Sequence, residues 1–237
     1  MQTTRNTRGF FLAVTAALVL VVSYGFGQNP ALQQKVAALK QAAAQNKQRL
    51  MHYQWNETQQ ITLKGEPKGS KQFLCQYGPN GQVIKTPLGD QQPQQAQQGG
   101  RLKQRIVEKK KEEMQDYMGD VKGVLALYVP PDPQKMQRAF QAGNVSFTPV
   151  NGAVNIVFKN YSQPNDQMTV TFDEAAKKIS HIDVNTYTQS PDQVVTLNVQ
   201  FASLPDGTNY TQQSVLDAKA KNLVVTTTNS NYQKLAQ

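Results

Sequence analysis

Few residues of this chain have the types and spacing that hydrolytic or metal chemistry requires. The two histidines, His52 and His181, lie far apart in the sequence, and the single cysteine is Cys75. With so few nitrogen and sulfur ligands, we expect no metal site. Asp173-Glu174 provides adjacent carboxylates, but a polar turn favours a structural role for them. The sequence contains no glycine-rich phosphate loop and no Gly-x-Ser-x-Gly turn, so we predict a protein that is not an enzyme and needs no cofactor.

Large apolar residues form the more informative pattern, because they alternate along predicted strands or recur along predicted helices. The candidates for lining a cavity between sheet and helices are Trp55, Ile61, Phe73, Tyr77, Met114, Met136, Phe140, Phe158, Phe172, Leu197 and Phe201. Methionine repacks readily around irregular acyl chains. The same residues would also suit a filled core, so two interpretations stay open: a pocket for an apolar or acylated ligand, and a packed interior.

The first of these residues belong to a short meander that follows an N-terminal helix. Asn29 and Pro30 suit the start of that helix, and apolar residues recur at helical spacing up to Leu50. From Tyr53 the apolar period changes to two, which indicates a strand. Three strands connected by glycine-containing turns at 65–69 and 78–81 are expected over residues 53–64, 73–77 and 83–87.

The second half of the chain adds two helices and a longer meander. Residues 89–100 are Gln-rich and predict a flexible loop. A helix over 102–128 and one that begins at Asp132-Pro133 and ends near Gly143 come next. Seven strands should follow, over 145–150, 154–158, 168–172, 179–187, 195–201, 210–215 and 223–228. These elements predict an α+β fold: a curled antiparallel sheet, forming an incomplete barrel, with about three helices over its concave face.

The N-terminus has the pattern of an export signal. Arg5 and Arg8 precede an apolar run over residues 10–22, and small residues follow up to Gly27. A run of about 13 residues is shorter than the roughly 20 that cross a bilayer as a helix. We therefore predict a signal peptide over 1–27 and a single periplasmic or secreted domain over 28–237. An N-terminal membrane anchor is the alternative.

The charge pattern bears on possible partners. The formal charge of the chain is +9, of which Arg5 and Arg8 supply two. The first helix carries Lys40, Lys47 and Arg49 with no acidic neighbour, and this basic surface suits an anionic membrane or an envelope protein. A solvated helix face is the plainer interpretation. No aromatic residues interleave with these bases, so no nucleic acid is expected.

The closing segment resembles that of a known superfamily. Ser203-Leu204-Pro205-Asp206-Gly207-Thr208-Asn209-Tyr210 is followed by a strand, a turn over 217–221 and a final strand that runs into Asn229-Ser230-Asn231-Tyr232. This tail, together with the order of helix, short meander, helix pair and long meander, resembles the LolA-like superfamily of periplasmic lipoprotein carriers. The resemblance implies an incomplete barrel closed by helices, and binding of a lipid or an acylated ligand. An envelope interaction or scaffold protein with a filled core is the alternative.

Overall fold

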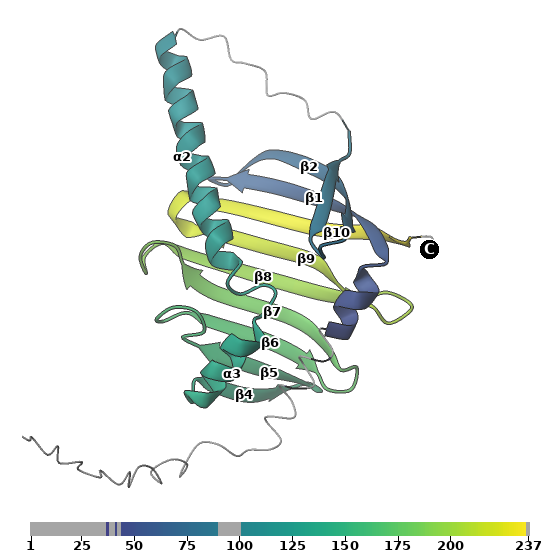
Figure 1. Ribbon diagram of the computed structural model, residues 1–237. Coiled ribbons are helices and arrows are strands. Elements are labelled where there is room, and N and C mark those ends of the chain that lie inside the picture. The colour runs from purple at the N-terminus through teal and green to yellow at the C-terminus, as the bar shows by residue number, and fades with distance from the viewer. Residues whose placement is uncertain (1–36, 38–40, 42–43, 90–100, 236–237) are drawn as a thin grey trace, which may run out of the picture.

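The chain forms one large antiparallel sheet with helices on its concave side (Figure 1). The computed structural model describes residues 37, 41, 44–89 and 101–235, without the side chains of 101–103. The expected signal segment, most of the first helix including Lys40, and most of the Gln-rich loop lie outside the described residues.

The observed elements follow the predicted order. Residues 44–50 are helical, and α2 (Arg101–Leu125), α3 (Pro133–Gln141) and a short 3-10 helix η1 (Lys219–Lys221) are the other helices in the described part. The strands are β1 (Tyr53–Leu63), β2 (Glu66–Tyr77), β3 (Val83–Pro87), β4 (Val145–Val150), β5 (Ala153–Lys159), β6 (Gln167–Asp173), β7 (Lys178–Tyr187), β8 (Val194–Ser203), β9 (Asn209–Ala218) and β10 (Leu223–Lys234). The predicted α+β class and curled antiparallel sheet are confirmed.

The two meanders are joined by pairing between the first and last strands. The order across the sheet is β3-β2-β1-β10-β9-β8-β7-β6-β5-β4, and every neighbouring pair is antiparallel. The outer strands β3 and β4 do not pair with each other, so the barrel remains incomplete. The β1–β10 ladder brings residues from opposite ends of the chain onto one surface.

Local sequence signals account for several boundaries. Asp132 accepts hydrogen bonds from the backbone N–H groups of Gln134 and Lys135, and this cap starts α3 with Pro133 in its first turn. Asn151 and Gly152 both adopt positive φ angles, of 43° and 82°, which a tight hairpin between β4 and β5 requires.

The core lies between the sheet and the C-terminal half of α2 together with α3 (Figure 1). The larger cluster is centred on Ile156, Phe158 and Met168, whose side chains are fully buried. A second cluster joins Tyr117 and Val121 of α2 to strands β8, β9 and β10. The larger cluster therefore covers strands β4–β8, and the second one lies over one end of β8, β9, β10 and β1.

Several predicted boundaries were wrong. β9 ends at Ala218 rather than at 215, β10 ends at Lys234 rather than at 228, and two further differences have a local reason. The expected turn over 65–69 is much shorter, because Lys64 and Gly65 with φ angles of 54° and 80° reverse the chain and β2 begins at Glu66. The expected helix over 102–128 ends at Leu125. The following turn carries Tyr128 into the core, where its hydroxyl lies 2.5 Å from Asp166 and 2.8 Å from Thr186.

Candidate functional site

An aromatic cluster occupies the part of the sheet where β1, β2, β9 and β10 meet. The Trp55 ring stacks on Tyr232 with centroids 5.5 Å apart and contacts Tyr77 at the same distance. Tyr232 in turn packs against Tyr210 at 4.4 Å and Tyr53 at 6.4 Å. Trp55 and Tyr53 are buried, and the other three rings are half-buried. Half-buried aromatic rings still offer some apolar surface to a ligand without any change of fold.

A bulge in β10 places Tyr232 against Trp55. The register between β1 and β10 changes between the pairs Gln54–Gln233 and Asn56–Ser230. Strand β10 therefore has one extra residue at this point, where Asn231 adopts a positive φ of 54°. Bulges of this kind redirect a side chain and increase the local twist of a strand.

The Trp55 indole is held by a buried hydrogen-bond chain. Its Nε1–H donates to Oδ1 of Asn229 at 3.0 Å, and Nδ2 of Asn229 donates to the carbonyl of Thr211 at 2.9 Å. Both polar ends of the buried amide are thereby satisfied. The orientation of the indole is fixed by strands β9 and β10 together.

A buried carboxylate lies next to the aromatic cluster on the same face. Glu57 is 6% exposed, and it accepts hydrogen bonds from Lys85 Nζ at 2.5 Å and from Gln59 Nε2 at 2.6 Å. Cys75, opposite Trp55 on β2, is fully buried, and burial raises the pKa of its thiol to about 11, with a further increase from Glu57. This thiol remains protonated at neutral pH, as expected for a structural cysteine.

The concave face is polar on strands β1, β10 and β9 and apolar on strands β8 to β5 along one row of residues. One row of directly paired residues crosses it from β1 to β5, and its members are Gln59, Thr227, Ser214, Val199, Ile182, Val170 and Ile156. The first three are polar and half-buried, and the last four are apolar and buried. We call Glu57, Gln59, Ser214 and Thr227 the polar band.

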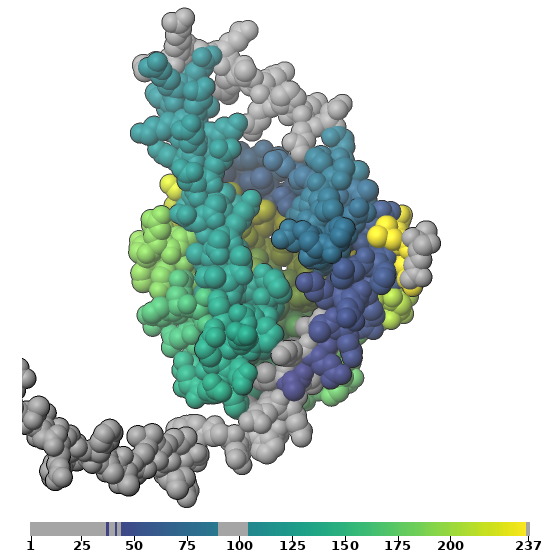
Figure 2. All heavy atoms as spheres, in the orientation of Figure 1, coloured from purple at the N-terminus to yellow at the C-terminus, as the bar shows by residue number. Residues whose placement is uncertain are grey.

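A hollow lies over this region. Figure 2 shows it between α2 and strands β2 and β3, with atoms of the C-terminal strands at its floor. The helix over 44–50 borders the hollow and is attached by Asn46, whose side chain exchanges two hydrogen bonds of 2.6 Å with the backbone of Asn209. The combination of aromatic cluster, polar band and bordering helix is the candidate site.

The residues that the sequence singled out fall into three groups. Trp55 and Tyr77 lie in the aromatic cluster. Phe73 lies two residues before Cys75 on the same face of β2, and Lys85 Nζ is 5.9 Å from its ring centroid. Ile61 and Met114 pack around the second core cluster.

The remaining candidates belong to the packed side of the sheet. Met136, Phe158 and Phe172 are buried members of the larger cluster, Leu197 and Phe201 pack against it, and Phe140 of α3 is half-buried. Lys47 and Arg49 of the basic surface are exposed on the helix over 44–50. The structure thus places three of the eleven cavity candidates in or beside the aromatic cluster.

Sequence reasoning missed Glu57, Asn229, Tyr210 and Tyr232. The period of two in β1 puts Glu57 on the same face as Trp55, and this was a usable signal for a buried carboxylate. Tyr232 had no such signal, because the bulge at Asn231 changes the alternation within β10.

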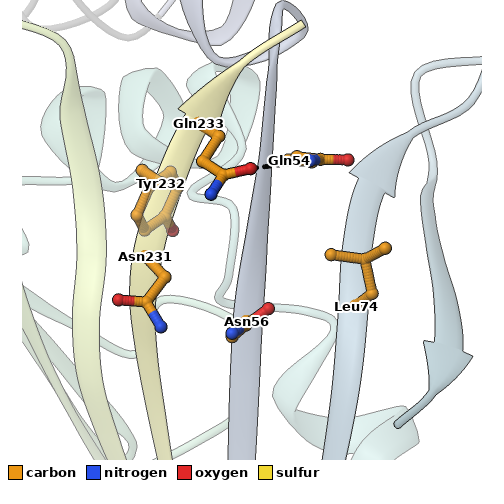
Figure 3. A pocket seen from close by; sticks show the side chains of 6 residues that line it. All are labelled: Gln54, Asn56, Leu74, Asn231, Tyr232 and Gln233. Atoms are coloured by element: carbon orange, nitrogen blue, oxygen red, sulfur yellow. Dashed lines mark hydrogen bonds between the residues drawn. The ribbon is translucent and has the colours of Figure 1, made fainter.

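A shallow pocket on the opposite face is a weaker candidate. Gln54, Asn56, Leu74, Asn231, Tyr232 and Gln233 line it, its volume is about 270 Å³, and Gln54 donates to Gln233 at 3.0 Å (Figure 3). Ligand pockets are usually enclosed, mostly apolar and at least about 300 Å³. This pocket is open and largely polar.

The described part of the chain holds neither a metal-ligand cluster nor a helix suited to crossing a membrane. Within residues 44–89 and 101–235, no group of three or more His, Cys, Asp or Glu side chains could hold a metal ion. None of the helices in that part is long and apolar enough to cross a membrane.

Comparisons with known proteins give a likeness of fold. No family model and no curated protein matches this chain. Among solved structures, it is similar to a DUF1329 family protein from Desulfovibrio piger, with a TM-score of 0.43, 9% identity, and coverage of 85% of this chain and 92% of that one.

Two further solved structures are described as a LolA superfamily protein and as a lipoprotein-sorting domain. A LolA superfamily protein from Nitrosomonas europaea has a TM-score of 0.41 and 8% identity, covering 85% of this chain and 94% of that one. A Vibrio parahaemolyticus domain described as outer membrane lipoprotein-sorting has a TM-score of 0.39 and 7% identity, covering 85% and 92%. All three likenesses are distant, with TM-scores below 0.5 and identities below 10%. Similarity this distant says nothing about ligands.

Proposed function

We propose that this chain is an exported, non-enzymatic protein that binds a lipid or another acylated ligand in the hollow of its concave face. The observation that carries the proposal is the half-buried aromatic cluster beside the polar band, on a part of the sheet that the core contacts of α2 and α3 do not reach. The aromatic rings suit an acyl chain, and the polar band suits the polar end of an amphipathic molecule. Export and a periplasmic location rest on the pattern of residues 1–27.

Trp55 provides a direct test because it is the only tryptophan in the chain. Residues 28–237 would be titrated with oleate and with lyso-phosphatidylglycerol while indole emission is followed. We expect a saturable change of emission, since a ligand in the hollow replaces water next to the Trp55–Tyr232 stack. A linear response, or none, would contradict the proposal.

Two variants separate binding from folding. Tyr232→Ala removes a ring from the cluster, and Ser214→Phe adds bulk to the polar band, so both should weaken probe binding at least tenfold. Tyr187→Ala is the matched control, because this tyrosine lies on the other face of β7 with its hydroxyl exposed. If all three variants bind the probe alike, the ligand does not occupy the hollow.

An envelope interaction or scaffold protein is the second candidate. The close packing of Phe158, Phe172 and Met136 under the helices favours it, because those side chains leave that half of the concave face filled. Co-purification of a stoichiometric partner, lost when Lys47 and Arg49 are reversed to Glu, would support this role. Retention of lipid after purification, extracted and identified by mass spectrometry, would argue against it.

A further inference from the structure

The N-terminal half of α2 is a helix without a supporting surface in the described part of the chain. Tyr117 and Val121 pack into the core, whereas every described side chain from Gln104 to Glu113 is exposed. Figure 1 shows this half projecting past the sheet. Thirteen residues at 1.5 Å each extend about 20 Å. Isolated helices of this length are marginal in water, so a partner that contacts the exposed half would stabilise it.

The projecting half combines positive charge with exposed apolar side chains. Residues 101–111 include six basic residues and one acidic residue, Glu108. Within this segment Ile106 and Val107 are 50% and 53% exposed. The acidic pair Glu112-Glu113 follows this segment in the sequence, nearer to the part of α2 that packs on the sheet. The end of the projection is therefore the most basic part of the helix.

We infer that the projecting half of α2 docks on anionic membrane surfaces. Basic side chains attract anionic headgroups, and adjacent aliphatic side chains insert at the boundary between headgroups and acyl chains. Basic residues alone would also suit other polyanions, but the exposed Ile106–Val107 pair favours an interface with apolar depth. The projecting half lies past the sheet, whereas the aromatic cluster and the polar band lie on its concave face, so docking and ligand binding can be measured separately.

Vesicle flotation tests the inference with residues 28–237. Vesicles of phosphatidylcholine with phosphatidylglycerol should bind the protein, binding should weaken with added salt, and pure phosphatidylcholine should bind far less. Reversing Lys109 and Lys111 to Glu should lower the partition coefficient on the order of 30-fold or more. Reversing Lys159 and Lys177 to Glu makes the same change in net charge at exposed positions outside α2 and should have a much smaller effect.

Ile106→Ser with Val107→Ser separates insertion from charge. This variant should keep its thermal unfolding midpoint, since both side chains are half-exposed, and should bind anionic vesicles at least tenfold less tightly. The inference would be overturned if the Lys109/Lys111 and Lys159/Lys177 variants lost vesicle binding equally. It would also be overturned if the protein bound vesicles with and without phosphatidylglycerol equally well. A dimer in sedimentation equilibrium that the Ile106/Val107 variant converts to monomer would overturn it too, because a second copy would then be the partner.

Discussion

Four hydrogen bonds converge on the buried carboxylate of Asp166, which is 2% exposed. Its Oδ1 accepts from the backbone N–H of Tyr161 at 2.5 Å. Its Oδ2 accepts from the backbone N–H groups of Ser162 at 2.8 Å and Gln163 at 2.7 Å, and from the Tyr128 hydroxyl at 2.5 Å. One side chain thereby joins the β5–β6 loop to the turn that follows α2.

Replacing Asp166 with Ala should be among the most destabilising single changes in this protein. A hydrogen bond to a charged acceptor contributes about 1.5–3 kcal/mol, and a buried donor left unpaired adds a desolvation cost. Because water can reach part of the loop, we expect the free energy of unfolding to fall by about 4 kcal/mol rather than by the full sum for four hydrogen bonds. With a denaturant slope of about 2 kcal/mol per molar, the urea midpoint should fall by about 2 M.

Equilibrium urea denaturation followed by circular dichroism measures this loss, and Asp173→Ala is the matched control. Asp173 also accepts two backbone hydrogen bonds, from Ala175 at 2.9 Å and Ala176 at 2.8 Å, but in an exposed turn. The control should cost about 1 kcal/mol or less. If Asp166→Ala lowers the midpoint no more than Asp173→Ala, then the convergence of bonds on Asp166 does not stabilise the fold as reasoned.

Three further outcomes are expected. Cys75 is fully buried with its pKa raised to about 11 by burial, so maleimide should label it at least ~100-fold more slowly in the folded protein than in urea. The pKa of Asp206 is lowered to about 2 by the backbone N–H of Thr208 and then by the Tyr53 hydroxyl. Its stabilising effect should be present above about pH 4 and lost towards pH 2, so urea midpoints of wild type and Asp206→Asn should differ at neutral pH and converge in acid. Asn46→Ala removes both bonds to the backbone of Asn209, so limited proteolysis within 44–52 should accelerate about tenfold, and an unchanged rate would contradict the attachment of this helix.

Sequence patterns predicted the elements of the sheet because their signals are local. Alternating residues such as Val154, Ile156 and Phe158 give a period of two that only a half-buried strand satisfies. The Asn151-Gly152 turn and the Asp132 cap also depend only on neighbouring residues. For this reason all ten strands were predicted, with errors confined to their ends.

The site was less predictable because long-range pairing assembles it. Nothing in the local pattern of β1 or β10 specifies that Trp55 and Tyr232 stack, since the two residues meet only through the β1–β10 ladder and its bulge. The sequence also suggested that apolar residues along the whole sheet line one cavity under the helices. The structure divides it, because Gln59, Ser214 and Thr227 face the same side as their apolar neighbours in the row.

The most direct test of ligand binding in the hollow is photo-crosslinking with a diazirine-labelled fatty acid, with the modified residues located by mass spectrometry. The account predicts labelling in the peptides that contain Trp55, Tyr77 and Tyr232, which form the centre of the aromatic cluster. Competition with unlabelled oleate should remove the label. Labelling confined to strands β5–β7 around Phe158 and Phe172, or no label that oleate displaces, would contradict it.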